Sequence, residues 1–256
     1  MSRTNKKNRN PHQLTMNQHC FPKKSIDRFA NDDGYVEVYL MQQSKKIIKR
    51  PSDKHFCAQR VWDQPSESGF MKNIEDDYQK LVDQLISENA DSISDMNHLT
   101  ITKMYSLWEA RSHWRNQHLD DTEIQGVRRP TIEISQDDCD LLEKNGITSM
   151  RSNSSIPGVH LTGLMLVMHV EQLVQVYRSW HWNILRSQTG DFLVPDKPSP
   201  LPSRFLPVNP NTCFSLARSR IISEAELAQI NTHLAKFSDK YYFSRSLSRC
   251  IFESSV

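Results

Sequence analysis

Apolar residues recur every three or four positions in three long parts of the chain. This spacing places their side chains on one face of a helix, and it predicts helices over residues 69–88, 97–117 and 159–180. The third helix contains the most apolar stretch, LTGLMLVMHVEQLVQVY, which His169, Glu171 and Gln172 interrupt. Those polar side chains favour a buried helix over a membrane span. In that setting we interpret His169 as a core histidine.

Short helices are indicated by their end signals. Ser223 is followed three residues later by Glu226, which is a capping box, and it predicts a helix that continues to about residue 237. Ser135 and Asp138 have the same spacing, and Gly146 is a suitable stop, so a second short helix is expected between them.

Alternating or β-branched stretches predict strands near both ends of the chain. VEVYLM and KKIIKR flank a polar turn and predict a hairpin over residues 36–50. HWNILRSQ and DFLVPD, joined at Thr189 and Gly190, predict a second hairpin. TCFSLA and KYYFSR read as further strands, and the proline-rich SPLPSRFLPVNP as an edge strand or a loop.

Together these elements predict an α+β fold. It has an N-terminal β-hairpin, central helices and a small C-terminal antiparallel sheet with a capping helix. Residues 13–256 are expected to form one domain, in which the opening and late segments meet. Residues 1–12 carry Arg3, Lys6, Lys7 and Arg9 without an apolar stretch, and we expect a disordered basic tail.

Composition narrows the classes of function. The net charge is +2, so a nucleic-acid site requires a local patch of cations. Only 7 glycines occur and none cluster, which argues against the glycine-rich loops that cradle phosphate in nucleotide-binding folds. The 5 cysteines are scattered, without a Cys-x-x-Cys pair, and they favour a reduced cytoplasm over a secreted disulfide framework. We expect a cytoplasmic protein without a membrane partner.

An apolar stripe that continues into arginine marks the second long helix. Ile101, Met104 and Trp108 are followed at the same spacing by Arg111 and Arg115. A guanidinium near the core needs a carboxylate or a phosphate as partner. Carboxylates are close by at positions 75 and 76 of the preceding helix, so we expect a salt bridge for Arg115 and leave the partner of Arg111 open.

The order of several short motifs resembles a bacterial family catalogued as domain of unknown function number 4238. The motifs are His19-x-x-Pro22 with Ile26 and Phe29, then a Gly-containing turn and strand, then Ile74-Glu75. A Trp-led strand at Trp182 and a Phe-led strand ending in Asp196-x-Pro198 complete the match, which spans residues 17–246. The chain departs from the family at Gln18, Lys23, Lys24 and Pro195. Relatives of this kind include phage-defence candidates, so the resemblance implies a defence role without naming a reaction.

The resemblance and the arginine stripe give one candidate catalytic set: His19, Glu75, Arg111 and Asp196. If these side chains converge, they suit a divalent metal or acid–base work on a phosphodiester. We expect His19, presented by Pro22, to lie about one bridging water from Asp196 or Glu75. The alternative is structural. In it His19 caps a turn, Glu75 pairs with Arg111, and Asp196 fixes a proline-containing turn.

Two rival sites are less well matched. His12, His19, Cys20, His55 and Cys57 offer zinc ligands, but their spacing does not fit the usual pairs of structural zinc sites. A Cys57–His55 dyad is similarly disfavoured, because neighbours on an irregular segment seldom align for proton transfer.

The sequence therefore supports two hypotheses about function. The first is an intracellular phage-defence or toxin-like effector that acts on nucleic acid, with a metal-dependent hydrolase as one form and a divalent metal as its cofactor. The second is a non-catalytic module that binds nucleic acid, a protein or another phage component. Its candidate phosphate contacts are Lys23, Lys24, Lys45, Lys46, Lys49 and Arg50.

Overall fold

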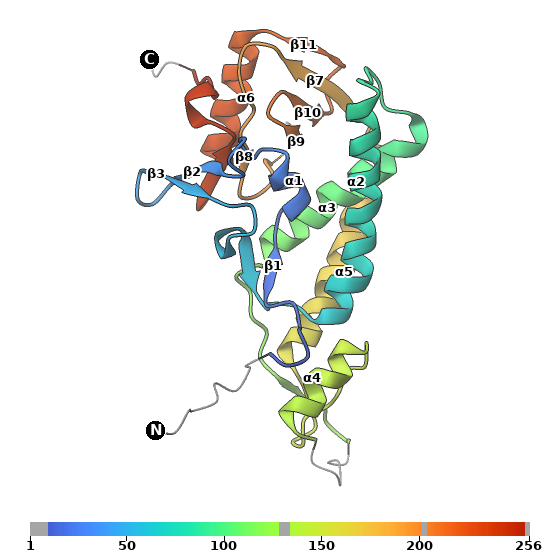
Figure 1. Cartoon of the computed structure of the whole chain (residues 1–256). Coiled ribbons are helices and arrows are strands. Elements are labelled where there is room, and N and C mark those ends of the chain that lie inside the picture. Colours follow the sequence, from blue (N-terminus) through green and yellow to red (C-terminus); the bar gives the residue numbers. More distant parts are fainter. Residues whose placement is uncertain (1–9, 128–133, 201–203, 254–256) are drawn as a thin grey trace, which may run out of the picture.

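A computed structural model of the chain describes residues 10–127, 134–200 and 204–253, and has the expected α+β fold (Figure 1). Residues 1–9 of the predicted tail lie outside the described residues. The helices begin and end close to the predicted positions. They are α1 (Lys23–Asp27), α2 (Lys72–Ser87), α3 (His98–Trp114), α4 (Gln136–Lys144), α5 (Gly158–Tyr177) and α6 (Glu224–Lys236).

The predicted helix ends are confirmed. Ser223 accepts from the backbone N–H of Glu226 while the Glu226 side chain accepts from that of Ser223, which closes a capping box at the start of α6. Ser135 accepts from the N–H of Asp138 at the start of α4. Gly146, just past the end of α4, has a φ of +81°, a left-handed conformation that glycine adopts without steric cost.

Short strands form four sheets in the described part of the chain. The two larger sheets have the strand orders β3-β2-β12-β8 and β11-β7-β10-β9, and the two small ones pair β1 with β4 and β5 with β6. The strand bounds are β1 Asn17–His19, β2 Val36–Leu40, β3 Lys45–Lys49, β4 Cys57–Gln59, β5 Thr122–Glu123, β6 Ser155–Ile156, β7 Asn183–Ser187, β8 Val194–Pro195, β9 Phe205–Asn209, β10 Thr212–Ser215, β11 Arg220–Ile222 and β12 Tyr241–Ser244.

The N-terminal hairpin of β2 and β3 is built as expected, and it is completed by the end of the chain. Strand β12 pairs antiparallel with β2, so that Tyr241 faces Leu40, and on its other side with β8. The opening hairpin and the late motif therefore lie in one sheet.

The predicted hairpin over residues 181–196 is wrong. Strand β7 pairs with β10 and, in parallel, with β11, whereas β8 belongs to the other sheet. The second half of the connection, residues 190–193, is buried: the N–H of Phe192 donates to the Pro210 carbonyl, and that of Leu193 donates to the Asn231 side chain on α6. These bonds carry the chain from one sheet to the next. The proline-rich segment forms β9, an edge strand in which Pro207 is opposite Cys213.

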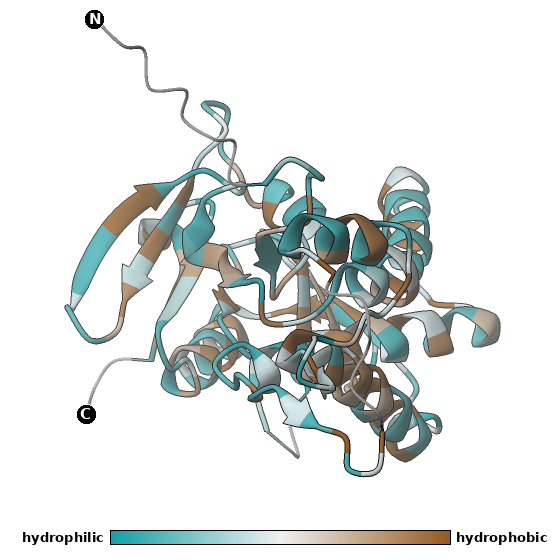
Figure 2. Cartoon of the chain, turned by 90° about the horizontal axis from the view of Figure 1, so that it is seen from below, coloured by the Kyte–Doolittle hydropathy of each residue, from teal (hydrophilic) through white to brown (hydrophobic). Residues whose placement is uncertain are grey.

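The core surrounds α3, which packs against both α2 and α5. Most faces of α3 carry buried side chains. The largest fully buried side chains of the protein include Trp108 of α3, Trp62 and Trp182. In the view of Figure 2, hydrophobic stretches run along the central helices, and the surrounding loops are largely hydrophilic.

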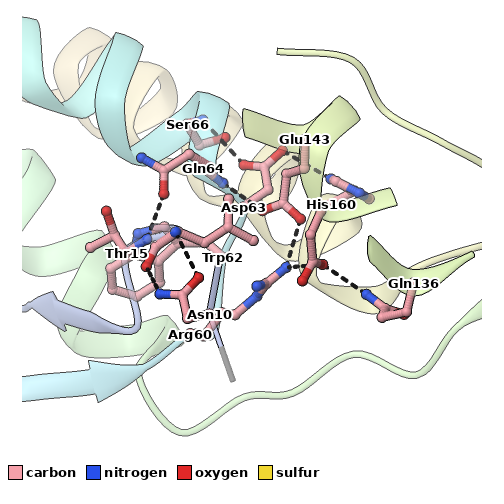
Figure 3. A network of polar contacts seen from close by, with 12 residues as sticks. Asn10, Thr15, Arg60, Trp62, Asp63, Gln64, Ser66, Gln136, Glu143 and His160 are labelled. Carbon is pink, nitrogen blue, oxygen red and sulfur yellow. Dashed lines mark hydrogen bonds and ion pairs between the residues drawn. The ribbon is translucent and has the colours of Figure 1, made fainter. Parts of the chain in front are cut away.

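Helix α4 lies at the end of the molecule away from the two larger sheets (Figure 1). It is joined to the body by a polar network (Figure 3), in which buried Glu143 accepts from Arg60 at 2.7 Å and from the N–H of Gln64 at 2.9 Å. Beside it, Asp63 lies 3.3 Å from His160 of α5. The described part of the predicted tail also makes contacts here, because the His12 ring is 2.9 Å from Asp137.

Candidate functional site

Arg111 is enclosed by two carboxylates. The side chain is 1% exposed on α3, it contacts Glu75, and it lies 3.3 Å from Glu67. Its guanidinium also sits 5.8 Å from the centre of the Trp62 ring. The structural alternative for this residue, a pair with Glu75, is therefore what the structure contains.

Asp196 is paired with Arg115, 3.3 Å away, and accepts the backbone N–H groups of Asp239 and Lys240 at 2.8 and 3.1 Å. Burial raises the pKa of this carboxyl, while the two N–H groups and Arg115 act against the rise. The salt bridge expected for Arg115 is present, but its partner is not Glu75 or Asp76. Asp76 binds Lys72 on its own helix, and Arg115 instead pairs with Asp196, the residue directly after β8.

The sequence had suggested that His19 precedes regular structure. It is instead the last residue of β1, where it is opposite Cys57 of β4. Its Nε2 lies 3.0 Å from the carbonyl of Pro51. Burial lowers the pKa of the ring, and the charges of Glu75 and Arg111 act on it in opposite directions. Pro22 stands directly before α1 and starts that helix.

The four predicted catalytic side chains thus lie around the buried side of α3, distributed over two ion pairs and one backbone contact. Cys20 lies among them, since the charges of Arg111, Arg115 and Asp196 all act on its thiol, whose pKa is raised by burial. Each charge is compensated by a neighbour. This arrangement stabilises the position of α3 and leaves little charge for a ligand.

A cleft of about 780 Å³ opens on the other side of α3. This volume is in the range of small-molecule and cofactor sites. We refer to it as the α3–α5 cleft. It is lined by Glu109, Ser112, His113 and Trp114 of α3, Met165, Met168, His169 and Gln172 of α5, and Lys197, Pro198, Pro200, Arg204, Phe237 and Asp239.

Three titratable groups face one another in the α3–α5 cleft. Glu109 and His113 are one helical turn apart on α3, and the ring of His113 lies 5.2 Å from that of His169 on α5, centre to centre. Burial raises the pKa of Glu109, and burial together with His113 lowers the pKa of His169. The shift of Glu109 moves its pKa toward neutral pH, whereas the shift of His169 favours the neutral ring, the form that can accept a proton.

The cleft also holds two cations. Buried Arg204 donates to the carbonyl of Ser199 at 2.7 Å and to the hydroxyls of Tyr105 and Tyr177, and it lies 3.6 Å from Glu109. Three aromatic rings stand about it, each with its centre 5.3 Å away. Arg204 is therefore held in one place. Lys197, by contrast, pairs with Asp239 at an exposed position.

The late motif Asp196-x-Pro198 forms part of the cleft wall. Lys197 and Pro198 line the cleft directly, and the Asp196 carbonyl lies 3.5 Å from the hydroxyl of Ser112, another lining residue. The Asp196 side chain is not itself a lining residue; it binds Arg115 and the backbone before β12, including the N–H of the lining residue Asp239. The motif therefore places its neighbours at the cleft.

No family model, no curated protein and no solved structure matches this chain. The chemistry of the α3–α5 cleft is therefore inferred from its side chains.

The other sequence-based candidates are accounted for as follows. Within the described residues, no three His, Cys, Asp or Glu side chains are grouped so that they could hold a metal ion, the zinc candidates included. Helix α5 is long and apolar enough to cross a membrane, and a third of its apolar window is buried inside the protein. The core helix of a soluble protein has the same length and composition, so these two properties do not identify a membrane span.

Five of the six candidate phosphate-contacting cations of the N-terminal region have side-chain partners of their own. Ion pairs join Lys23 to Asp27, Lys24 to Asp83, Lys46 to Glu37 and Lys49 to Asp53, and Arg50 donates to the Tyr35 hydroxyl. These contacts reduce the net positive field that a phosphate would meet on this surface.

Sequence reasoning missed Glu109, His113, Lys197 and Arg204, and it interpreted His169 as a core residue. His169 is half-buried and lines the α3–α5 cleft. A signal was present on α3, because Glu109 and His113 are spaced by four and share a helix face. No pattern indicated that His169, 56 residues beyond His113, would be opposite that face.

Proposed function

We propose that this chain is an effector that acts on nucleic acid and that the α3–α5 cleft is the site that receives the phosphodiester backbone. The observation that carries the proposal is the presence of Glu109, His113, His169, Lys197 and Arg204 in one cleft. Cations, imidazoles and a carboxylate are the groups that bind a phosphodiester and move protons around it.

Lys197 is the residue best suited to a first phosphate contact. Its pair with Asp239 is exposed, with the two side chains 37% and 64% accessible, and pairs of this kind contribute little stability. A phosphate can therefore replace Asp239 at small cost. Arg204 lies deeper, and its rigid surroundings supply a fixed positive charge behind that contact.

Apolar side chains stand beside these charges. Trp114, Met165, Met168 and Phe237 line the same cleft. Flat and polarisable side chains bind bases without regard to their identity, so this composition suits a single strand whose bases are unstacked.

The biological setting, phage defence or toxin-like action in the bacterial cytoplasm, is also a proposal. Its support is the resemblance of the His19–Pro22, Ile74–Glu75 and Asp196–Pro198 motifs to a family with defence candidates. A plaque assay on cells that express the chain, compared with cells that express a Lys197→Ala variant, tests this setting separately from the molecular proposal.

A non-catalytic binding module is the second candidate. The observation that favours it is the mutual compensation of His19, Glu75, Arg111 and Asp196, since the side chains first expected to be reactive are held by each other or by backbone. In this case the cleft binds its ligand and no bond is broken.

The decisive measurement is the affinity of the purified chain for labelled single-stranded RNA and DNA, followed by fluorescence anisotropy at several salt concentrations. Lys197→Ala should weaken binding several-fold and reduce the salt slope by about 1, as expected for the loss of one phosphate contact. Lys72→Ala is the matched control, because Lys72 is also exposed and paired with an aspartate, but lies on α2 outside the cleft. Absence of binding, or equal effects of both substitutions, would contradict the proposal.

A further inference from the structure

We infer that the α3–α5 cleft cleaves RNA through the 2′-hydroxyl next to the scissile phosphate, with His169 as proton acceptor and His113 as proton donor. The inference rests on the proposed function and adds the substrate class and the reaction. It is carried by the juxtaposition of two imidazoles and two cations in one cleft.

The two histidines are close enough to divide acid and base roles between them. Their ring centres are 5.2 Å apart and the ring planes are nearly perpendicular, at 82°. At this separation a charge on one imidazole disfavours a charge on the other, which favours different roles for the two rings. Because burial and the neighbouring ring lower the pKa of His169, the neutral ring is that of His169.

His113 has a carboxylate and an amide as neighbours. Glu109 lies one turn earlier on α3 and interacts electrostatically with His113. On the other side, the Gln117 amide lies 3.0 Å from His113 Nε2, and an amide can offer either its nitrogen to a neutral ring or its oxygen to a charged one. These neighbours can accompany either form of the ring, and His113 takes the role of proton donor because His169 is the ring suited to accept.

The step balances with the groups present. His169 takes the proton of the 2′-hydroxyl, whose oxygen forms a bond to phosphorus. The bond from phosphorus to the 5′-oxygen breaks, and that oxygen receives the proton of His113. The products are a 2′,3′-cyclic phosphate and a 5′-hydroxyl. Lys197 and the fixed guanidinium of Arg204 stabilise the extra negative charge on the phosphorus oxygens in the transition state.

The 2′-hydroxyl makes the inference specific to RNA. DNA has no nucleophile at that position, so it can occupy the cleft and remain intact. Acid–base chemistry of this kind uses side chains that already line the cleft.

The test measures binding and cleavage with the same full-length protein. A labelled single-stranded RNA, its DNA counterpart and its fully 2′-O-methylated form are incubated in excess EDTA. Binding is followed by anisotropy, and products by electrophoresis and mass spectrometry. We expect all three to bind, and only the unmodified RNA to yield fragments that end in a 2′,3′-cyclic phosphate.

The variants use a matched histidine pair in the same chain. His113→Ala and His169→Ala should each lower the cleavage rate by about 10²- to 10⁴-fold and change RNA affinity little. His181→Ala is the control, because His181 and His98 also have ring centres 5.2 Å apart, and neither lines the α3–α5 cleft. This control should cleave within about twofold of the unmodified chain.

The possible failures are distinguishable. RNA that binds in a Lys197-dependent manner but stays intact overturns the cleavage inference and leaves the proposed binding function standing. Cleavage of DNA, loss of cleavage in EDTA, or equal cleavage by the His169→Ala variant also overturns it. If none of the three oligonucleotides binds, both the inference and the proposed function are wrong.

Discussion

The buried cluster around Arg111 gives a stability prediction that depends on which member of the cluster is most deeply enclosed. The Arg111 side chain is 1% exposed, whereas those of Glu67 and Glu75 are 17% and 25% exposed. Removing the arginine leaves two carboxylates that can turn toward water. Removing both negative charges leaves one guanidinium that has no access to water. The second change should therefore be the more damaging one.

The magnitudes follow from the same exposures. Breaking a buried pair so that a charge stays unpaired costs about 3–5 kcal/mol, and this is the loss we expect for the double change Glu67→Gln and Glu75→Gln. For Arg111→Met we expect about 1–2 kcal/mol, because an apolar chain of similar length fills the space and no buried charge remains. The triple variant with all three substitutions should recover part of the loss of the double variant, since its guanidinium is gone.

Urea unfolding followed by circular dichroism measures these differences, with the slope against urea as a check on two-state behaviour. Lys72→Gln is the control, because Lys72 makes an exposed pair with Asp76 within α2, the helix that also carries Glu75, and its loss should stay within about 0.5 kcal/mol. If Arg111→Met is as destabilising as the double glutamate change or more so, then an unpaired Arg111 is not the most costly charge in this cluster. The inference from side-chain exposure would then be wrong.

Three further predictions concern other parts of the molecule. Gly163→Ala in α5 should lose about 1–3 kcal/mol in a thermal melt despite the higher helix propensity of alanine, because the added methyl group would overlap the Asp63 carboxylate and lie 2.7 Å from the Ser66 hydroxyl; an unchanged melt would contradict this. Burial raises the pKa of Glu109, so its contribution to stability is complete below the unfolded pKa of about 4.3 and is lost as pH rises through the folded pKa. Urea unfolding at pH 4 and 7 should therefore show Glu109→Gln gaining stability relative to the unmodified chain at the higher pH, and a constant difference would oppose the assignment. Asp196→Asn should cost about 1–3 kcal/mol in urea unfolding by removing the charge that faces Arg115, and an unchanged unfolding curve would contradict this.

The sequence predicted the helices well because their signals are local. The stripe of α2, the caps of α4 and α6 and the apolar run of α5 all depend on residues within one or two turns. The strand pairing was less predictable, because partners in a sheet can be far apart in the chain. Thr189-Gly190 has the composition of a hairpin turn, yet buried bonds to Pro210 and Asn231 direct the following residues to another sheet.

The candidate site was likewise predictable only where the signal is local in the sequence. The arginines of α3 were recognised as buried charges because they continue an apolar stripe, and Glu75 was correctly weighed as a partner of Arg111. The partner of Arg115 was not recognised, because Asp196 is 81 residues further along the chain. The cleft required knowledge of how α3 and α5 face each other, which no spacing within either helix contains.

The two sides of α3 are connected through the segment that follows β8. On one side Asp196 binds Arg115 and the N–H groups of Asp239 and Lys240. On the other side the next residue, Lys197, lines the cleft and pairs with Asp239. Because Asp196 and Lys197 are adjacent, the position of the cation at the cleft is set by an ion pair that no ligand needs to touch.

This arrangement gives the Asp196-x-Pro198 motif a role that differs from the reactive one first expected for Asp196. The Asp196 carboxylate fixes the loop by accepting the N–H of Asp239, and Pro198 lines the cleft beside Lys197. A change at Asp196 would then alter binding in the cleft by moving Lys197, with an affinity loss that Lys197→Ala should largely reproduce. Combining the two substitutions tests this directly, because effects that pass through one residue do not add. Additive losses would instead mean that Asp196 acts independently of Lys197.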